Sequence, residues 1–227
     1  MIIKNIIDVF FPQLCFGCES ALLRNQKILC TNCLHQLPFT GQHLYRNNDA
    51  LDKFYGRLSL QNCSCLLYFT KEGLVQRLFH HLKYKNQPQI SYYLGQIYAF
   101  QLQNLSWLAT VDSIIPVPLH KKKQKTRGYN QVDGFAQALS EAFKIPVDKQ
   151  LLTQKVFTIS QTQKKLFERT TPNPLRFSIN SQPHHHGQHF LIVDDILTTG
   201  GTLESCGKKL LEIPNSTISI LCLAQTQ

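Results

Sequence analysis

Four cysteines near the beginning of the sequence have the spacing of a metal-binding site. Two C-x2-C pairs with eleven residues between them comprise Cys15, Cys18, Cys30 and Cys33. Each pair can place two thiolates on a tight turn, in which Gly17 is expected to adopt a positive φ, and four thiolates form the tetrahedral shell that zinc favours. Two disulfides are the alternative, but the N-terminal stretch lacks the cleavage site of a secretory signal, so we expect a reducing, cytoplasmic setting. The spacing therefore predicts a structural Zn²⁺ ion.

A second group of chemically capable residues lies in the sequence FLIVDDILTTGGTLES, residues 190–205. Asp194 and Asp195 follow four apolar residues that predict a buried strand, and ligands bind at the carboxyl ends of such strands. Carboxylates repel phosphate but accept hydrogen bonds from ribose hydroxyls and coordinate Mg²⁺, so we expect them to face those groups. The next residues can offer backbone N–H groups, hydroxyls and the positive end of a helix dipole to a phosphate. These are Thr198, Thr199, Gly200, Gly201 and Thr202.

A third feature is a strongly basic stretch in the middle of the chain. The 227 residues carry 24 Lys and Arg against 14 Asp and Glu, and residues 71–185 alone hold 16 against 6. Such a patch attracts the phosphates of a small ligand or of nucleic acid through salt-sensitive electrostatics. The plainer alternative is a solvated loop that keeps the protein soluble. The densest part contains Lys121, Lys122, Lys123, Lys125 and Arg127.

Strands that alternate with helices are needed to position these residues. A composition of 43% hydrophobic and 17% charged residues is that of a globular chain, and no apolar run reaches the ~18 residues of a membrane span. The hydrophobic pattern predicts an α/β fold with a mainly parallel sheet. Expected strands are two within 51–70, then 113–118, 190–193 and 216–224; expected helices are 72–82, 90–105, 130–143 and 203–211. A short N-terminal helix and a loop or excursion over 156–176 complete the expectation.

The motif VDDILTTGGT, residues 193–202, resembles the phosphoribosyl pyrophosphate (PRPP) signature of type I phosphoribosyltransferases. The order of four-cysteine ribbon, IIPVPLHKKKQKTRGYNQ and PRPP motif resembles the ComF/GntX family of competence proteins. This resemblance implies a zinc ribbon over 1–45 and a phosphoribosyltransferase-like domain over 46–227. It implies that residues 198–202 hold the 5'-phosphate, and that the two aspartates hold ribose and Mg²⁺. The implied pyrophosphate loop is Pro116, Val117, Pro118, Leu119 and His120, followed by an R-G-[FY]-N-Q block at Arg127, Gly128, Tyr129, Asn130 and Gln131.

Two functions remain open from the sequence. As a competence factor, the chain would handle incoming single-stranded DNA during natural transformation and bind PRPP with Mg²⁺. Its ribbon would dock DNA, a DNA-uptake helicase or other competence proteins. Candidate platforms for stacking bases are Tyr84, Tyr92, Tyr93, Tyr129 and Phe167. As an enzyme, the chain would transfer phosphoribosyl from PRPP to an acceptor whose site the sequence does not reveal, and catalytic residues stay unassigned.

The remaining cysteines and a histidine run have plainer interpretations. Cys63, Cys65, Cys206 and Cys222 lack a matching second pair, so we expect ordinary buried cysteines. His184, His185 and His186 lie between Pro183 and Gly187, which predicts a polar loop. Glu204 falls in the first turn of the expected helix, where it would favour the helix dipole.

Overall fold

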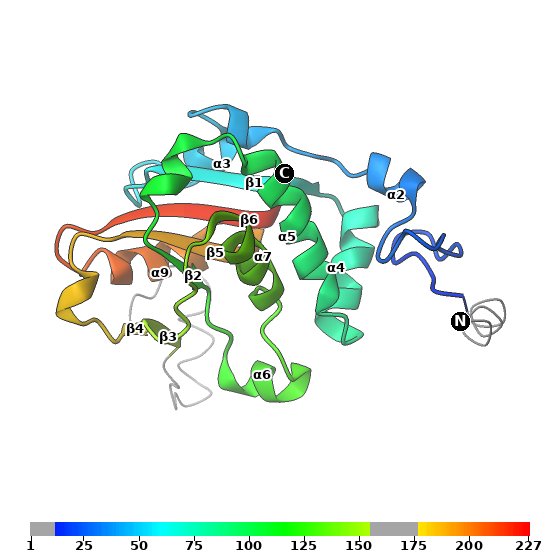
Figure 1. The fold of residues 1–227 in the computed structure, drawn as a ribbon. Helices are drawn as coiled ribbons and strands as arrows, with labels where there is room; N and C mark the ends of the chain where they lie inside the picture. Colours follow the sequence, from blue (N-terminus) through cyan, green and yellow to red (C-terminus); the bar gives the residue numbers. More distant parts are fainter. Residues whose placement is uncertain (1–11, 155–176) are drawn as a thin grey trace.

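A computed structural model describes residues 12–154 and 177–227, and its centre is a four-stranded parallel sheet (Figure 1). The strands run in the order β1 (Asn62–Phe69), β6 (Thr217–Thr226), β5 (His189–Leu197) and β2 (Ser113–Pro116). An isolated parallel bridge between Ile114 and Val147 extends the sheet beyond β2. A separate antiparallel pair is formed by β3 (Leu152–Gln154) and β4 (Phe177–Ile179).

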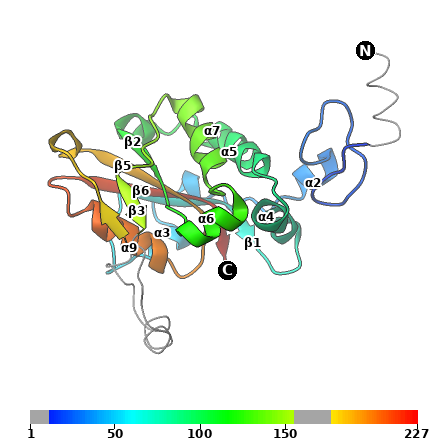
Figure 2. The ribbon, with the colours of Figure 1, turned by 90° about the horizontal axis from the view of Figure 1, so that it is seen from below.

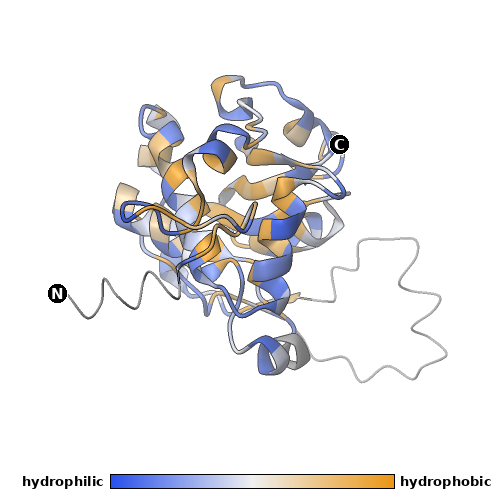
Figure 3. Cartoon of the chain, turned by 90° about the vertical axis from the view of Figure 1, so that its right-hand side faces the viewer, coloured by the Kyte–Doolittle hydropathy of each residue, from blue (hydrophilic) through white to orange (hydrophobic). Residues whose placement is uncertain are grey.

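Both faces of the sheet are buried, as a parallel sheet requires. Alternate residues of β5 point to opposite faces: Leu191 and Val193 pack in one apolar cluster, Phe190 and Ile192 in the other. All four are fully buried. Figure 3 shows the apolar residues gathered toward the centre of the molecule. The near-continuous apolar run of this strand is therefore explained by burial on two sides.

Helices cover both faces of the sheet (Figures 1 and 2). One face carries α4 (Leu74–Tyr84), α5 (Gln89–Leu102) and α7 (Asp133–Phe143); the other carries α3 (Asp49–Asp52) and α9 (Gly201–Leu210). Helices α5 and α7 approach closely because of two glycines. A Cβ at Gly95 would lie 2.8 Å from the Cβ of Ala138, and one at Gly134 would lie 2.5 Å from the Ser91 hydroxyl.

The segment before β1 is tied to the sheet by a buried polar network. Gln42 is only 3% exposed and accepts a hydrogen bond from the Cys65 amide at 2.8 Å. Its amide nitrogen donates to Gln225 and to Asp49, and Gln225 donates back to Asp49 at 2.7 Å. Since every partner is paired, the network fixes residues 42–49 against β1 and β6.

The predicted α/β class and mainly parallel sheet are confirmed, and several local predictions are wrong. The two strands expected within 51–70 are one strand, β1, preceded by helix α3 and turns, because Asn48 caps α3 by accepting from the amides of Ala50 and Leu51. The basic stretch expected as a loop is a short helix, α6 (Lys121–Arg127). The expected N-terminal helix lies largely, and the 156–176 segment entirely, outside the described residues.

Short helices complete the described chain. They are α2 (Thr31–His35), η1 (Gln42–Leu44), η2 (Ser106–Thr110) and η4 (Pro183–His185). The last replaces part of the polar loop expected at the histidine run. His185 is buried there, and its ring accepts a hydrogen bond from the Gln182 amide at 2.8 Å. The prediction of buried cysteines is confirmed for Cys63, Cys65, Cys206 and Cys222. Within the ranges 12–154 and 177–227, the helices are all too short or too polar to cross a bilayer.

Candidate functional site

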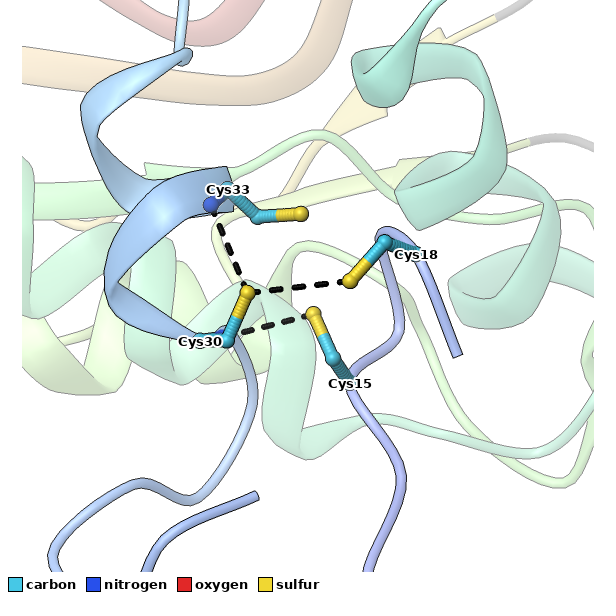
Figure 4. A group of neighbouring side chains, drawn as sticks. All are labelled: Cys15, Cys18, Cys30 and Cys33. Atoms are coloured by element: carbon cyan, nitrogen blue, oxygen red, sulfur yellow. Dashed lines mark hydrogen bonds between the residues drawn. The ribbon is translucent and has the colours of Figure 1, made fainter. Parts of the chain in front are cut away.

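The four N-terminal cysteines converge on one point (Figure 4). Their sulfur atoms all lie within 4.8 Å of one another. The first two belong to the turn after residue 14, whereas Cys30 caps α2 and Cys33 lies in its first turn. Zn–S bonds of ~2.3 Å place tetrahedral sulfurs ~3.8 Å apart, so the donor set fits a closed four-thiolate centre. The structure therefore contains a candidate metal centre at the predicted residues.

Backbone amides and a hydroxyl group lie close to the sulfur atoms of this cluster. The amides of Gly17 and Cys30 lie 3.4 and 3.3 Å from the Cys15 sulfur. A hydrogen bond with the Ser20 hydroxyl lowers the pKa of Cys18 to about 6, whereas burial raises the pKa of Cys33. Because metal ligation requires thiolates, loading the centre releases protons.

The cysteine module rests on α4, and Gly17 is the point of closest approach. A Cβ at Gly17 would lie 2.4 Å from Leu74 and 2.8 Å from the Cys33 sulfur. The expectation of a positive φ at this glycine is wrong: the residue is needed for space. Arg77 of α4 donates to the Gly17 carbonyl at 2.6 Å, and the rings of Phe16 and His81 meet edge-to-face at 5.1 Å.

The predicted phosphate loop lies between β5 and α9. Thr198 and Thr199 are exposed, and Gly201 begins the ten-residue helix α9. Gly200 has φ +79°, and a Cβ there would lie 2.9 Å from the ring of Phe54. Glycine is therefore needed at this position for two reasons: the left-handed backbone conformation disfavours other residues, and a side chain would clash with Phe54. The loop presents its amides and threonine hydroxyls at a helix N-terminus, which suits a phosphate.

Arg57, which was not singled out from the sequence, holds this loop in place by hydrogen bonds. Its guanidinium donates to the Thr199 carbonyl at 3.0 Å and to Glu204 at 2.9 Å. Glu204 is 2% exposed and also pairs with Lys208 at 2.6 Å, so its role is an ion-pair network and not only a dipole contact. Burial raises the pKa of Glu204, but the hydrogen bonds from Lys208 and Arg57 outweigh that effect and hold the pKa below its ordinary value.

The two aspartates lie at the carboxyl end of β5 in different surroundings. Asp194 is partly exposed, and its Oδ1 accepts from the Asp195 amide at 2.8 Å. Asp195 is 7% exposed, and its Oδ2 accepts from Gln131 at 3.1 Å and pairs with Lys83 at 2.7 Å. Lys83 comes from the end of α4, and nothing in its local sequence pointed to this contact. The pairing joins segments that lie far apart in the chain.

The segment after β2 lies beside these aspartates. Its Val117 amide donates to the Val193 carbonyl of β5 at 3.0 Å, and Asn130 donates to the Val117 carbonyl at 3.0 Å. Pro116, Pro118 and Leu119 line a cavity of about 220 Å³, and His120 leads into α6. The structure therefore brings the predicted pyrophosphate loop, the aspartates and the phosphate loop to one edge of the sheet.

The R-G-Y-N-Q block links the basic helix to Asp195. Arg127 at the end of α6 donates to the side-chain oxygen of Gln131 at 2.9 Å, and Gln131 in turn holds Asp195. The same guanidinium lies over the Tyr84 ring at 5.5 Å. Tyr129 donates to the Leu82 carbonyl, which ties the block to α4.

One domain family and several solved structures are similar to this chain. Residues 134–226, which include the aspartates and the phosphate loop, match the phosphoribosyl transferase domain family. Adenine phosphoribosyltransferase from Saccharomyces cerevisiae aligns with 77% of this chain and 86% of its own, at 16% identity and a TM-score of 0.40. For the purine phosphoribosyltransferase of Pyrococcus horikoshii the coverages are 59% and 70%, at 21% identity and a TM-score of 0.36. The sheet, the motif and the family match define a type I phosphoribosyltransferase-like fold.

The chain is also similar to proteins named for competence and DNA utilization. The DNA utilization protein YhgH of Shigella flexneri is 30% identical over 154 residues, which is 66% of each chain and so slightly less than two thirds of that protein. Competence protein F of Haemophilus influenzae is 27% identical over 230 residues, covering 95% of this chain and 98% of that protein. Competence protein ComFC of Bacillus subtilis is 30% identical over 99 residues, 44% of this chain and 38% of its own. The chain is thus similar to ComF-type competence proteins, over nearly its whole length in the case of competence protein F.

Proposed function

We propose that this protein handles incoming single-stranded DNA during natural transformation and binds PRPP with Mg²⁺ at its phosphoribosyltransferase-like site. The observation that carries the proposal is the meeting of a basic helix, an exposed aromatic ring and the aspartate pair at one edge of the sheet. Relatives named for competence and DNA utilization support it. The four-cysteine centre would hold a structural Zn²⁺.

The proposed site would offer PRPP a donor or a cation for each of its charged groups. Residues 198–202 would hold the 5'-phosphate with backbone amides and hydroxyls, because they lead into the N-terminus of α9 at Gly201. Asp194 and Asp195 would accept from ribose hydroxyls and hold Mg²⁺, whose charge offsets that of the pyrophosphate. The segment 116–120 would contact the pyrophosphate, since it lies beside the aspartates.

Tyr84 is the best-placed of the candidate stacking residues. Its side chain is 68% exposed, with the Arg127 guanidinium at 5.5 Å and the His80 ring at 5.4 Å. Tyr92 is partly buried and bonded to Glu141, Tyr93 packs against the core, and Tyr129 is bonded to Leu82. Phe167 lies outside the described residues. We therefore assign base stacking to Tyr84 and contacts with the DNA backbone to the lysines of α6.

Phosphoribosyl transfer is the second candidate function, and one cavity favours it. A hollow of about 350 Å³ at the end of β6 is lined by Asp49, Asp52, Lys53, Gln225 and Thr226. Asp49 and Gln225 are paired in the buried network, so the exposed Asp52 carboxylate is the group that could recognise the polar edge of an acceptor. On this alternative, PRPP would be consumed and pyrophosphate released once the acceptor is added.

The test is a titration of metal-loaded protein with fluorescent oligo-dT. If α6 contacts about four phosphates, affinity should fall about 50-fold between 50 and 200 mM salt. PRPP with Mg²⁺ should change the affinity of the natural protein and leave an Asp194→Asn, Asp195→Asn variant unaffected. Weak DNA binding at 50 mM salt, together with PRPP consumption, would favour the transferase and refute the DNA-handling role.

Replacing Tyr84 by alanine should weaken oligo-dT binding about tenfold, because one stacked base is worth roughly 1–3 kcal/mol. Fluorescence anisotropy at fixed salt measures the change. Tyr45→Ala is the matched control, since Tyr45 is 67% exposed but lies next to η1, away from α6. Equal losses in the two variants would show that Tyr84 has no special part in DNA binding.

A further inference from the structure

Lys83 forms an ion pair with Asp195, the carboxylate that the proposed ligand would have to contact. Its Nζ lies 2.7 Å from Asp195 Oδ2, and the two side chains are only 21% and 9% exposed. The same oxygen accepts from Gln131 at 3.1 Å. Lys83 Nζ also lies 5.6 Å from the centre of the Phe79 ring, one helical turn back on α4. The ammonium group is therefore held at Asp195 from two sides.

Ligand binding and this ion pair are in direct competition. A ribose hydroxyl or Mg²⁺ at Asp195 meets an oxygen that already has a cation and an amide donor. Two cations on one carboxylate oxygen repel each other, and the repulsion is screened less than in bulk water because both side chains are largely buried. Lys83 must therefore leave Asp195, wholly or in part, when the ligand arrives.

We propose that Lys83 is an exchange residue: it neutralises Asp195 in the free protein and transfers its ammonium group to the pyrophosphate of PRPP when ribose and Mg²⁺ take the carboxylate. The proposal rests on the proposed function, because it names a specificity-determining residue of the same site. No bond is made or broken in the exchange. The ammonium keeps its charge and changes only its partner.

Pyrophosphate is the group best suited to receive the Lys83 ammonium when it leaves Asp195. It carries the largest share of the negative charge of PRPP, and a compact ammonium binds phosphate oxygens as a point charge. Its expected position, beside the segment 116–120, adjoins Asp195 because Val117 is hydrogen-bonded to Val193 of the same strand. Arg127 is less available, since its guanidinium is engaged by Gln131 and Tyr84.

The exchange would make the site selective for PRPP over ligands without pyrophosphate. Ribose 5-phosphate can use the same phosphate loop and the same aspartates. It must displace Lys83 from Asp195 without offering the ammonium a new partner. Leaving a charged group unpaired in a largely buried place is costly, so ribose 5-phosphate should bind weakly while Lys83 is present.

The test compares two ligands on matched variants by calorimetry with Mg²⁺ present. In Lys83→Met, PRPP affinity should fall about tenfold and ribose 5-phosphate affinity should rise at least threefold. Lys85→Met is the control: it removes the same charge from an exposed position two residues later, and both affinities should stay within twofold. The opposite movement of the two ligands distinguishes exchange from a purely structural ion pair.

Other outcomes are equally decisive. If both affinities rise in Lys83→Met, the lysine only blocks Asp195 and the exchange is refuted. If both fall, the ion pair supports the fold alone, and a lowered thermal midpoint with normal ligand binding in Lys83→Arg would confirm that interpretation. If the natural protein binds neither ligand, the proposed PRPP site itself fails, which is a separate result.

Discussion

Replacing Cys33 by serine is expected to abolish high-affinity metal binding and to unfold the segment that carries the four cysteines. Serine does not supply a thiolate, and a structural zinc centre contributes its binding energy directly to folding. The segment has few buried apolar side chains of its own, chiefly Ile28, Leu29 and Leu37. We expect metal affinity to fall more than ~100-fold, since each ligand is worth several kcal/mol of a total of about 10–16 kcal/mol.

Metal content by mass spectrometry and amide exchange over residues 12–35 measure the two effects. Cys63→Ala is the matched control: that cysteine is also buried, but it lies in β1 and outside the cluster. It should retain one metal ion per chain. One metal ion per chain in Cys33→Ser would contradict the four-thiolate centre. Faster exchange should extend into α4, because Arg77 and Leu74 contact the cysteine turn.

Replacing Gly200 by alanine is expected to abolish PRPP binding, with at least a 100-fold loss of affinity. Alanine at this position would have to adopt φ +79°, and its methyl group would lie only 2.9 Å from the Phe54 ring. The loop must therefore move. Movement displaces the amides at the start of α9 that are expected to meet the phosphate. Calorimetry with PRPP and Mg²⁺, and with ribose 5-phosphate, measures the loss.

Gly187→Ala separates the backbone effect from the site effect. Gly187 has φ +75° but nothing within 4 Å of its would-be Cβ, and it lies at the opposite end of β5. Both variants should lose ~1 kcal/mol of stability from the left-handed conformation. Only Gly200→Ala should lose ligand binding. Equal binding in the two variants would remove residues 198–202 from the phosphate site.

Features encoded by local spacing were predictable from the sequence. The cysteine pairs, the apolar run of β5 and the position of the loop 198–200 between β5 and α9 each depend on residues close together in the chain. The pattern before β1 misled the prediction, because LSLQ has strand-forming residues yet forms no strand: its Leu58 and Leu60 pack against the apolar cluster beneath the sheet. Propensity is a weak guide where capping and tertiary contacts compete with it.

Contacts between distant segments were beyond the reach of the sequence. Lys83 reaches Asp195, and Arg57 reaches Thr199 and Glu204, only because the sheet brings their elements together. Surface lysines and arginines are common, so nothing marked these two in advance. The helical form of residues 121–127 was likewise missed, because a run of lysines is compatible with either a loop or a helix.

The order of strands in the sheet also has a consequence for biosynthesis. Strand β6 lies between β1 and β5, yet it follows both in the chain, and its Ser219 faces Asn62 across a separation of 157 positions. The inner edge of β1 and one edge of β5 therefore stay unpaired until β6 leaves the ribosome. Such long-range closure is slow, and exposed strand edges favour association with other chains. The nascent chain is therefore most exposed to association with other chains before β6 is in place.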